Sequence, residues 1–402
     1  MNSRERILSA LNMEEPDRVP CHTILIDGNN CDEILGYPQK TEIEIAEEIR
    51  QNNPDGWYKE LNGIVESIEV ITFSRWVEAA IAIGLDVMQF GMIPFYFVPY
   101  EEIEASKPAH INIDKDKFWM KDIFGRVWMN HDNAGNFDPY YMYGTTTIEN
   151  WEETKEKLLG PLKEKYIKQA KKTYRRVNKK YKDKIFVIGT NNYLGVWDSA
   201  WQGMGIEYYA KNLRKNPRFI KDVHETITEF NLALYNAYMD VGCEVFLEDG
   251  DLAYKKGPMM SPKQFEEFIL PNYKRIVENT HERGCKHVLH SDGNLMRIMD
   301  LIVECGFDGF HSMEPTAGMD IAEMKQKYGD KLCLWGNIDV AETLFDGTKE
   351  DVFNEVKYCI KNAGQGGGLI ISASNMHPGV KVQNLRWMVE ATKEFGTYPL
   401  NI

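Results

Sequence analysis

The sequence of 402 residues predicts a single (β/α)8 barrel, because short buried strands recur along the chain, helical stretches separate them, and polar residues follow them. Apolar runs rich in β-branched and aromatic residues alternate with longer stretches of helical periodicity. Parallel strands need crossover helices, and nearly continuous apolar runs indicate burial on both faces. An open, doubly wound sheet is the main alternative.

Eight strand segments are expected, which is the number that a closed barrel of this class requires. No linker rich in proline or serine interrupts the pattern, so we expect one domain over residues 1–402. In chain order, the expected strands are residues 19–26, 85–90, 185–189, 243–248, 287–290, 309–313, 332–335 and 369–372.

The chain departs from a minimal barrel at residues 94–147, directly after the second expected strand. This segment contains H-I-N-I-D, K-F-W-M-K-D and G-R-V-W-M-N, alternating patterns separated by Asp, Gly and Asn that predict antiparallel strands. We expect this β-rich insertion to cover the barrel mouth and to contribute aromatic residues to a pocket. A surface hairpin that buries its aromatic residues for stability is the alternative.

Composition excludes several classes of protein. A formal net charge of −14 argues against binding to a nucleic-acid backbone. No apolar run approaches the length of a membrane span, and the charged N-terminal stretch lacks the apolar core of a signal peptide. We therefore expect a cytoplasmic enzyme with neither a nucleic-acid nor a membrane partner, and a homodimer remains possible. The seven cysteines include no C-x-x-C spacing and are expected to be mainly buried, reduced thiols.

Polar residues at the ends of the expected strands are the candidates for a site, since barrel active sites are built there. In K-H-V-L-H-S-D-G-N, His290 and Asp292 are two residues apart and point the same way. Imidazole and carboxylate ligands suit zinc or another divalent metal, and the same groups suit an acid/base pair. Asp249 and Asp251 flank a glycine, as turn formers do. The candidate catalytic residues are Glu248, Asp251, His290 and His377, and the candidate substrate-binding residues are Asn191, Tyr193, Trp197, Glu314 and Asn337.

Four separated motifs match the pattern of a known superfamily. They are R-E-R-I-L-S-A-L-N-M-E-E-P-D-R-V-P near the start, the central H-S-D-G-N, L-W-G-N-I-D-V, and the closing H-P-G-V-K-V-Q-N-L-R-W-M-V-E-A. On these motifs the chain resembles the uroporphyrinogen decarboxylase superfamily, which also contains zinc-dependent methylcobamide:coenzyme M methyltransferases and the methyltransferases of corrinoid-dependent demethylation systems. The resemblance spans nearly the whole chain and implies a (β/α)8 barrel.

Departures from the superfamily pattern separate its branches. The decarboxylases hold an acidic tetrapyrrole with an arginine-bearing loop after the first strand, whereas this chain has the acidic I-L-I-D-G-N-N-C-D-E there. The coenzyme M methyltransferases bind zinc through His-x-Cys-Gly and a further cysteine. The resemblance thus implies that His290 is a ligand, that Asp292 replaces the thiolate, and that His377 is the nearest substitute for the third ligand. The convergence of these residues on strand ends, together with the ligand position that the resemblance implies at His290, predicts that Glu248, Asp251 or His377 completes a site with His290 and Asp292.

Histidine and carboxylate are harder ligands, in the acid–base sense, than thiolates. A metal held by them is better suited to bind an oxygen atom of the substrate than a sulfur atom. We therefore expect a methyltransferase, dependent on zinc or another divalent metal, that moves a methyl group from a small, methoxylated aromatic substrate to the cobalamin of a separate corrinoid protein. The alternative is a metal-free decarboxylase of a small carboxylate or porphyrinogen-like substrate, with Asp251, His290 and His377 as acid/base groups. A non-catalytic corrinoid- or metabolite-binding barrel is the third hypothesis.

Overall fold

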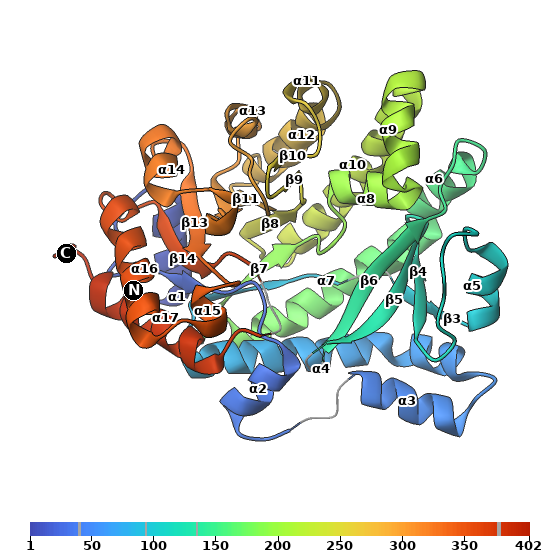
Figure 1. Ribbon diagram of the computed structural model, residues 1–402, viewed down its shortest axis with the longest axis horizontal. Helices are drawn as coiled ribbons and strands as arrows, with labels where there is room; N and C mark the ends of the chain where they lie inside the picture. Colours follow the sequence, from blue (N-terminus) through green and yellow to red (C-terminus); the bar gives the residue numbers. More distant parts are fainter. Residues whose placement is uncertain (39–41, 93–94, 134–135, 376–378) are drawn as a thin grey trace.

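The computed structural model describes residues 1–38, 42–92, 95–133, 136–375 and 379–402, and it contains the expected barrel (Figure 1). Each of the eight expected segments contains a parallel strand, so the predicted fold class is confirmed. The hydrogen-bonded order is β1-β14-β13-β12-β11-β8-β7-β2. The strands are β1 (Cys21–His22), β2 (Val87–Phe90), β7 (Phe186–Thr190), β8 (Val245–Asp249), β11 (Lys286–Ser291), β12 (Gly309–Ser312), β13 (Cys333–Ile338) and β14 (Leu369–Ala373).

Helices connect the strands and surround them (Figure 1). None of the described helices combines the length and the apolar character that crossing a bilayer requires. The main helices are α1 (Ser3–Leu11), α2 (Gly28–Leu35), α3 (Glu42–Asn52), α4 (Trp57–Ile83), α6 (Trp151–Leu159), α7 (Pro161–Tyr181), α8 (Val196–Met204), α9 (Ile206–Lys215), α10 (Pro217–Met239), α12 (Leu270–His281), α13 (Met299–Glu304), α14 (Ile321–Tyr328), α16 (Lys349–Ala363) and α17 (Val382–Phe395). Short elements are α11 (Pro262–Gln264), α15 (Thr343–Asp346) and the hairpin of β9 (Ala253–Tyr254) and β10 (Gly257–Pro258).

Alternate residues of each barrel strand face opposite sides, which determines which side chains reach the interior. Val245 and Leu247 pack in one interior cluster, whereas Phe246 between them packs against the surrounding helices. The interior cluster also contains Ile7 and Leu11 of α1, so this helix closes the amino-terminal end of the barrel. The open end is therefore the carboxyl end, where the candidate residues lie.

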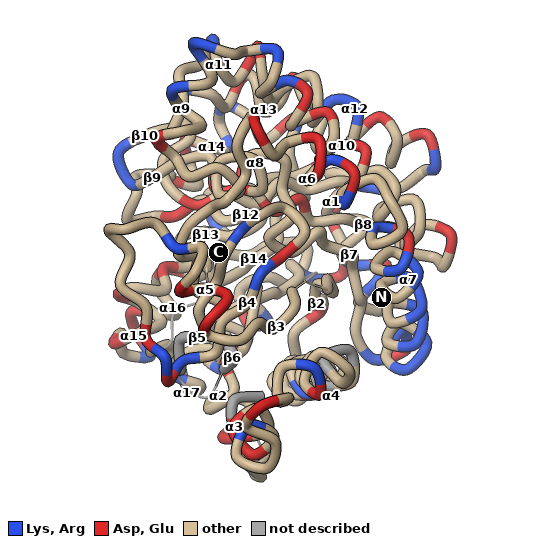
Figure 2. The backbone as a smooth tube through the Cα atoms, turned by 90° about the vertical axis from the view of Figure 1, so that its right-hand side faces the viewer, with Lys and Arg blue, Asp and Glu red and all other residues tan. Residues whose placement is uncertain are grey.

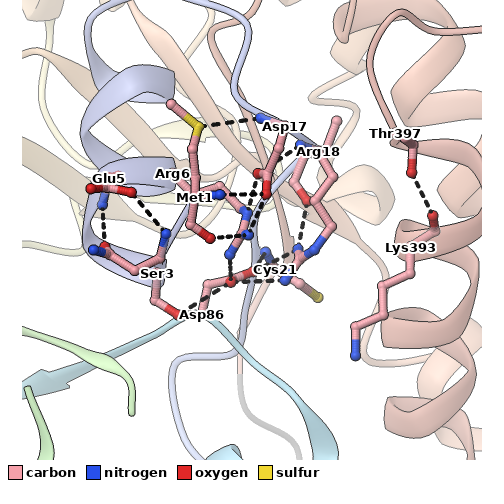
Figure 3. A network of polar contacts seen from close by, with 12 residues as sticks. Met1, Ser3, Glu5, Arg6, Asp17, Arg18, Cys21, Asp86, Lys393 and Thr397 are labelled. Carbon is pink, nitrogen blue, oxygen red and sulfur yellow. Dashed lines mark hydrogen bonds and ion pairs between the residues drawn. The ribbon is translucent and has the colours of Figure 1, made fainter. Parts of the chain in front are cut away.

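The barrel closes between β1 and β2 through one buried aspartate (Figure 3). The backbone N–H of Asp86 donates to the carbonyl of Cys21 at 2.9 Å, and the Asp86 carboxylate accepts from the N–H of Cys21 at 2.9 Å. Two arginines donate to the same carboxylate. Arg6 forms one hydrogen bond of 2.6 Å, and Arg18 forms two, of 2.8 and 2.9 Å. Arg6 also pairs with Asp17 at 2.7 Å. The N-terminal sequence motif therefore provides the arginines that neutralise the carboxylate at the seam.

The expected insertion forms a separate antiparallel sheet in the order β3-β4-β5-β6, so the prediction of a β-rich insertion is confirmed. Its elements are β3 (Phe95–Val98), α5 (Tyr100–Ser106), β4 (Trp119–Asp122), β5 (Arg126–Asn133) and β6 (Asn136–Gly144). Buried Arg126 donates to the carbonyl of Tyr193 at 2.6 Å, and the hydroxyl of Tyr141 donates to the carbonyl of Gln202 at 2.8 Å. Because these contacts lie on α8 and on the loop after β7, the sheet forms a wall beside the barrel mouth (Figure 1).

The insertion approaches α8 so closely that Gly144 has no room for a side chain. A Cβ atom at this position would lie 2.2 Å from the carbonyl oxygen of Gln202. We expect Gly144→Ala to lower the free energy of unfolding by about 1–3 kcal/mol, because the two backbones must separate. Gly63→Ala is the control: it lies inside α4 with nothing within 4 Å of the added Cβ, and it should be neutral or stabilising by up to about 1 kcal/mol. Urea unfolding of both variants tests this, and equal stabilities would contradict the close contact.

Candidate functional site

Three predicted residues meet at the carboxyl ends of β8 and β11. Asp251, His290 and Asp292 each offer a ligand atom, and these atoms all lie within 4.8 Å of one another. The Nε2 atom of His290 lies 3.9 Å from Oδ1 of Asp251. The structure therefore brings together the H-x-D pair and one of the three residues that the sequence offered as its partner.

Backbone contacts between the two strand ends hold this cluster in place. Parallel pairing sets His290 opposite Asp249, and the N–H of Gly250 donates to the carbonyl of His290 at 3.2 Å. The N–H of Asp292 donates to Oδ1 of Asp251 at 3.1 Å. His290 is only 4% exposed, whereas the Asp251 side chain is 54% exposed. A ligand arriving from the mouth would therefore meet Asp251 first and His290 at the base.

The carboxylate of Asp292 has one oxygen without a partner. Oδ2 accepts a hydrogen bond from the side-chain amide of Asn375. Oδ1 is buried and has no partner at ordinary hydrogen-bond distance within the described part of the chain, although the hydroxyl of Ser312 lies near enough to the carboxylate to oppose the rise in its pKa. A buried carboxylate oxygen without a donor is costly, and a proton or a cation would satisfy it.

Negative charge is concentrated around His290. Burial raises the pKa of Asp292 to about 7, despite the opposing effect of His290. Burial also raises the pKa of Asp198, with further contributions from Asp251 and Asp249. For His290 itself, burial lowers the pKa, but the surrounding carboxylates outweigh it and raise the pKa above the ordinary value. A site with such raised carboxyl pKa values holds protons near neutral pH or takes up a cation.

A row of buried polar side chains continues from His290 across the barrel interior. His290 Nδ1 lies 2.7 Å from His311 Nδ1, and His311 Nε2 lies 3.1 Å from the hydroxyl of Ser372. That hydroxyl lies 3.1 Å from His22 Nδ1, and His22 Nε2 lies 2.9 Å from Gln89 Oε1. Burial lowers the pKa of His22 to about 4 and that of His311 well below its ordinary value. Both of these histidines are therefore neutral at physiological pH.

The structure places Glu248 away from this cluster, so it corrects the prediction of Glu248 as a catalytic or ligand residue. In β8, Val245 and Leu247 face the interior, which directs Glu248 outward to the helices. Its carboxylate accepts from the hydroxyl of Tyr235 and lies 3.6 Å from His287 Nε2. Glu248 is fully buried between strand and helix and does not reach the barrel mouth.

The predicted substrate-binding residues surround the mouth, and most of them support its backbone. Asn191 accepts from the N–H of Asp249 at 2.9 Å, and the indole of Trp197 donates to the carbonyl of Asp251 at 2.9 Å. Glu314 accepts from the N–H of Gly293 at 3.1 Å, which holds the H-S-D-G turn. Asn337 donates to the carbonyl of Met319 at 2.8 Å. Tyr193 is 37% exposed at the rim and is the best placed of the five to touch a substrate, while His377 lies outside the described residues.

Two carboxylates at the site were not among the predicted residues. Asp249 was interpreted as a turn former, yet it is the last inward residue of β8 and accepts from the N–H of Tyr193 at 2.7 Å. Asp198 begins α8 and accepts from the N–H of Asp251 at 2.9 Å. Left-handed backbone at Tyr193 (φ 63°) and at Met313 (φ 54°) lies at the same rim, and such conformations concentrate at functional sites. The apolar residues on both faces of β8 hid the inward orientation of Asp249, and no local pattern marked Asp198.

The family model for uroporphyrinogen decarboxylase (URO-D) matches residues 126–395 of the chain. The chain belongs to the uroporphyrinogen decarboxylase family. The match includes every strand from β7 onward and hence both strand ends that carry Asp251, His290 and Asp292. The family resemblance inferred from the sequence motifs is thereby confirmed.

Relatives of this family member include two kinds of enzyme. A methylated-thiol:coenzyme M methyltransferase of Methanosarcina mazei is 26% identical over 191 residues, which cover 47% of this chain and 48% of the relative. A methylcobamide:CoM methyltransferase of Methanosarcina barkeri is 27% identical over 48% of this chain and 54% of the relative. A uroporphyrinogen decarboxylase of Chlorobaculum tepidum is 24% identical over 60% of this chain and 68% of the relative. The chain thus spans about half the length of the two methyltransferases.

A solved structure supports the fold over the full length of this family member. A methyltransferase from Methanosarcina mazei superposes with a TM-score of 0.68 and covers 98% of this chain and 99% of its own. Its sequence identity is 18%, so the likeness establishes the fold.

Proposed function

We propose that this member of the uroporphyrinogen decarboxylase family is a corrinoid-dependent methyltransferase. It would move a methyl group from a small, methoxylated aromatic substrate to the cobalamin of a separate corrinoid protein, with zinc or another divalent cation at the site. The observation that carries the proposal is the convergence of Asp251, His290 and Asp292 at the carboxyl end of the barrel. The methyltransferases among the relatives support the reaction class.

The residues of the cluster fit a divalent cation. One imidazole nitrogen and two carboxylate oxygens are ordinary ligands for zinc, and three protein ligands leave a position for substrate. Oδ1 of Asp292 is buried and has no hydrogen-bond partner among the described residues, so this atom would gain most from such an ion. A bound cation there would supply Lewis acidity toward an ether oxygen.

The remaining groups of the site suit the departure of a phenolate. Asp198 is 7% exposed and lies in contact with the Asp251 backbone, and burial raises the pKa of its carboxyl to about 8. A protonated carboxyl could protonate a leaving oxygen, where each tenfold of rate needs about 1.4 kcal/mol. Both oxygens of Asp198 also accept hydrogen bonds, from the N–H of Asp251 and from the indole of Trp201 at 3.0 Å, and these contacts oppose the rise in its pKa. Tyr193, with its ring 6.0 Å from that of Trp128, offers an aromatic face at the rim. The buried Trp197 supports the wall behind Asp251.

Decarboxylation of a small carboxylate is the second candidate. The protonated carboxyl groups favour it, since Asp198 and Asp292 could deliver a proton to a carbanion. Against it, the cluster is acidic, and no described Lys or Arg forms an ion pair with Asp198, Asp249, Asp251 or Asp292. An anionic substrate would be repelled unless a cation were bound.

The test is to mix the protein with zinc(II), Co(I) cobalamin and a panel of aryl methyl ethers, and to follow methylcobalamin by absorbance. We expect methyl transfer from at least one ether. Absence of transfer from any ether, amine or thioether, together with release of carbon dioxide from a carboxylate substrate, would establish the second candidate instead.

Binding of a cation is expected to depend on pH, because protons compete for the same atoms. The pKa of Asp292 is raised to about 7, so this carboxyl is largely protonated below that pH, and the raised pKa of His290 adds a competing proton in the same direction. The affinity for zinc(II) should therefore increase as pH rises through about 7, by up to about tenfold per pH unit for each proton released. Competition titrations with a chromophoric chelator at several pH values measure this. An affinity that stays constant between about pH 6 and 8 would exclude these ligands.

A further inference from the structure

We infer that a chain of buried side chains across the barrel fixes the tautomer of His290, so that Nε2 presents its lone pair to Asp251 and Asp292. The chain, here called the barrel relay, consists of His290, His311, Ser372, His22 and Gln89 from five different strands. The inference deepens the proposed function and rests on it for the role of His290 as a ligand. The tautomers of His22 and His311 are properties of the metal-free protein, and that of His290 is read once zinc(II) is bound.

The far end of the barrel relay fixes the proton on His22. The indole N–H of Trp335, which can only donate, lies 3.0 Å from His22 Nδ1, so Nδ1 must accept. On the other side, the amide nitrogen of Gln89 donates to the carbonyl of Ile24, which leaves Oε1 of Gln89 to accept from His22 Nε2 at 2.9 Å. Both neighbours therefore require a proton on Nε2 and none on Nδ1 of His22.

The hydrogen bonds of Ser372 determine which ring nitrogen of His311 carries the proton. The hydroxyl of Ser372 lies 3.1 Å from His22 Nδ1 and 2.8 Å from the carbonyl of Ala373, and both of these atoms can only accept. Because the indole of Trp335 already occupies the one lone pair of His22 Nδ1, the hydroxyl proton of Ser372 goes to the carbonyl of Ala373. The third neighbour, His311 Nε2 at 3.1 Å, is the group that can donate to this hydroxyl, so we place the proton of His311 on Nε2.

The last step reaches the proposed metal site. Neutral His311 with its proton on Nε2 has a lone pair on Nδ1, which lies 2.7 Å from His290 Nδ1. His290 must then donate from Nδ1, and its Nε2 faces Oδ1 of Asp251 at 3.9 Å. Histidines that bind metals usually donate their other N–H to a protein acceptor, which fixes the tautomer and the ring orientation. His311, Ser372 and His22 are thus positioning residues for His290.

The tautomers can be read directly by NMR of the full-length, metal-free protein labelled with ¹⁵N-histidine. Protonated and unprotonated ring nitrogens differ clearly in chemical shift, and single His→Gln variants assign the signals. We expect His22 and His311 both to carry the proton on Nε2, and His290 to carry it on Nδ1 after zinc(II) is added. A proton on Nδ1 of His311 would overturn the inference, whether or not zinc(II) binds.

A second measurement tests the effect of Ser372, which contacts His290 only through His311. Ser372→Ala removes the hydroxyl that accepts from His311 Nε2 and leaves only the contact of His311 with the backbone of Ala373, so we expect zinc(II) affinity to fall by about 10–100-fold and the proton of His311 to shift toward Nδ1. Ser199→Ala is the matched control, because this buried serine of α8 lies outside the barrel relay, and its affinity should be unchanged. Unchanged affinity and an unchanged His311 tautomer in Ser372→Ala would contradict the inference. Absence of zinc(II) binding by the natural protein would instead refute the proposed function.

Discussion

Replacing His290 by alanine is expected to lower the affinity for zinc(II) by at least about 100-fold and to abolish methyl transfer. Loss of a group that merely supports a ligand already costs about 10–100-fold, and His290 supplies the single nitrogen of the proposed ligand set. Its removal would also take away the histidine that lies beside Asp251 and Asp292 and balances their charge. Isothermal titration calorimetry and the methylcobalamin assay measure the two effects.

The matched control for this variant is His281→Ala. His281 also lies close to an aspartate, with Nε2 at 2.8 Å from Asp308, but its side chain is 40% exposed and it ends α12, at the amino-terminal side of β11 and not at the carboxyl end that carries the cluster. Its removal should leave zinc(II) affinity and methyl transfer unchanged. Stoichiometric zinc(II) retained by a His290→Ala, Asp292→Ala double variant would place the metal elsewhere and refute the proposed ligand set.

Replacing Asp86 by alanine is expected to have the largest effect on stability. The Asp86 side chain is 2% exposed and faces two arginines (Figure 3). Its loss removes the carboxylate with which Arg18 pairs and leaves Arg6 with Asp17 alone. Removing one partner of a buried ion pair typically costs about 3–5 kcal/mol. Guanidinium unfolding followed by circular dichroism measures the change.

Glu153→Ala is the control for the Asp86 variant, because Glu153 pairs with Lys157 on an exposed helix face. Exposed pairs of this kind contribute about 0.3–0.5 kcal/mol. If Asp86→Ala destabilised the protein no more than Glu153→Ala, the seam would have to be held by the strand contacts alone.

Charge is distributed unevenly over the surface. Figure 2 shows Lys and Arg gathered along α7, although the chain has a formal net charge of −14. On this helix, Lys171 pairs with Asp240 and Lys180 with Glu78, while Tyr166 and Tyr174 are buried against the barrel. The basic face is thus partly neutralised by the neighbouring helices α4 and α10.

Much of the fold could be predicted from the sequence, because strand and helix periods are local signals. Each expected strand segment contains a barrel strand, and the insertion has the expected antiparallel sheet. The first strand was expected over residues 19–26 but contains only Cys21 and His22, since the chain soon turns toward Asp27 at the start of α2. Local patterns therefore locate strands more reliably than they set their ends.

The candidate site was harder to predict, because buried parallel strands lack the alternation that shows which residues face inward. In β8, residues of both faces are apolar, so nothing local distinguishes Glu248, which faces Tyr235, from Asp249, which faces the interior. His22 gave no signal either, since its partners Gln89 and Ser372 lie on other strands. Only strand register brings such residues together.

The most direct test of the account is a crystal structure of the protein loaded with zinc(II), with anomalous scattering recorded at the zinc edge. We expect one strong peak bounded by Nε2 of His290, Oδ1 of Asp292 and a carboxylate oxygen of Asp251. A structure in which these three side chains form hydrogen bonds with one another, with no anomalous peak between them, would contradict the proposed metal site.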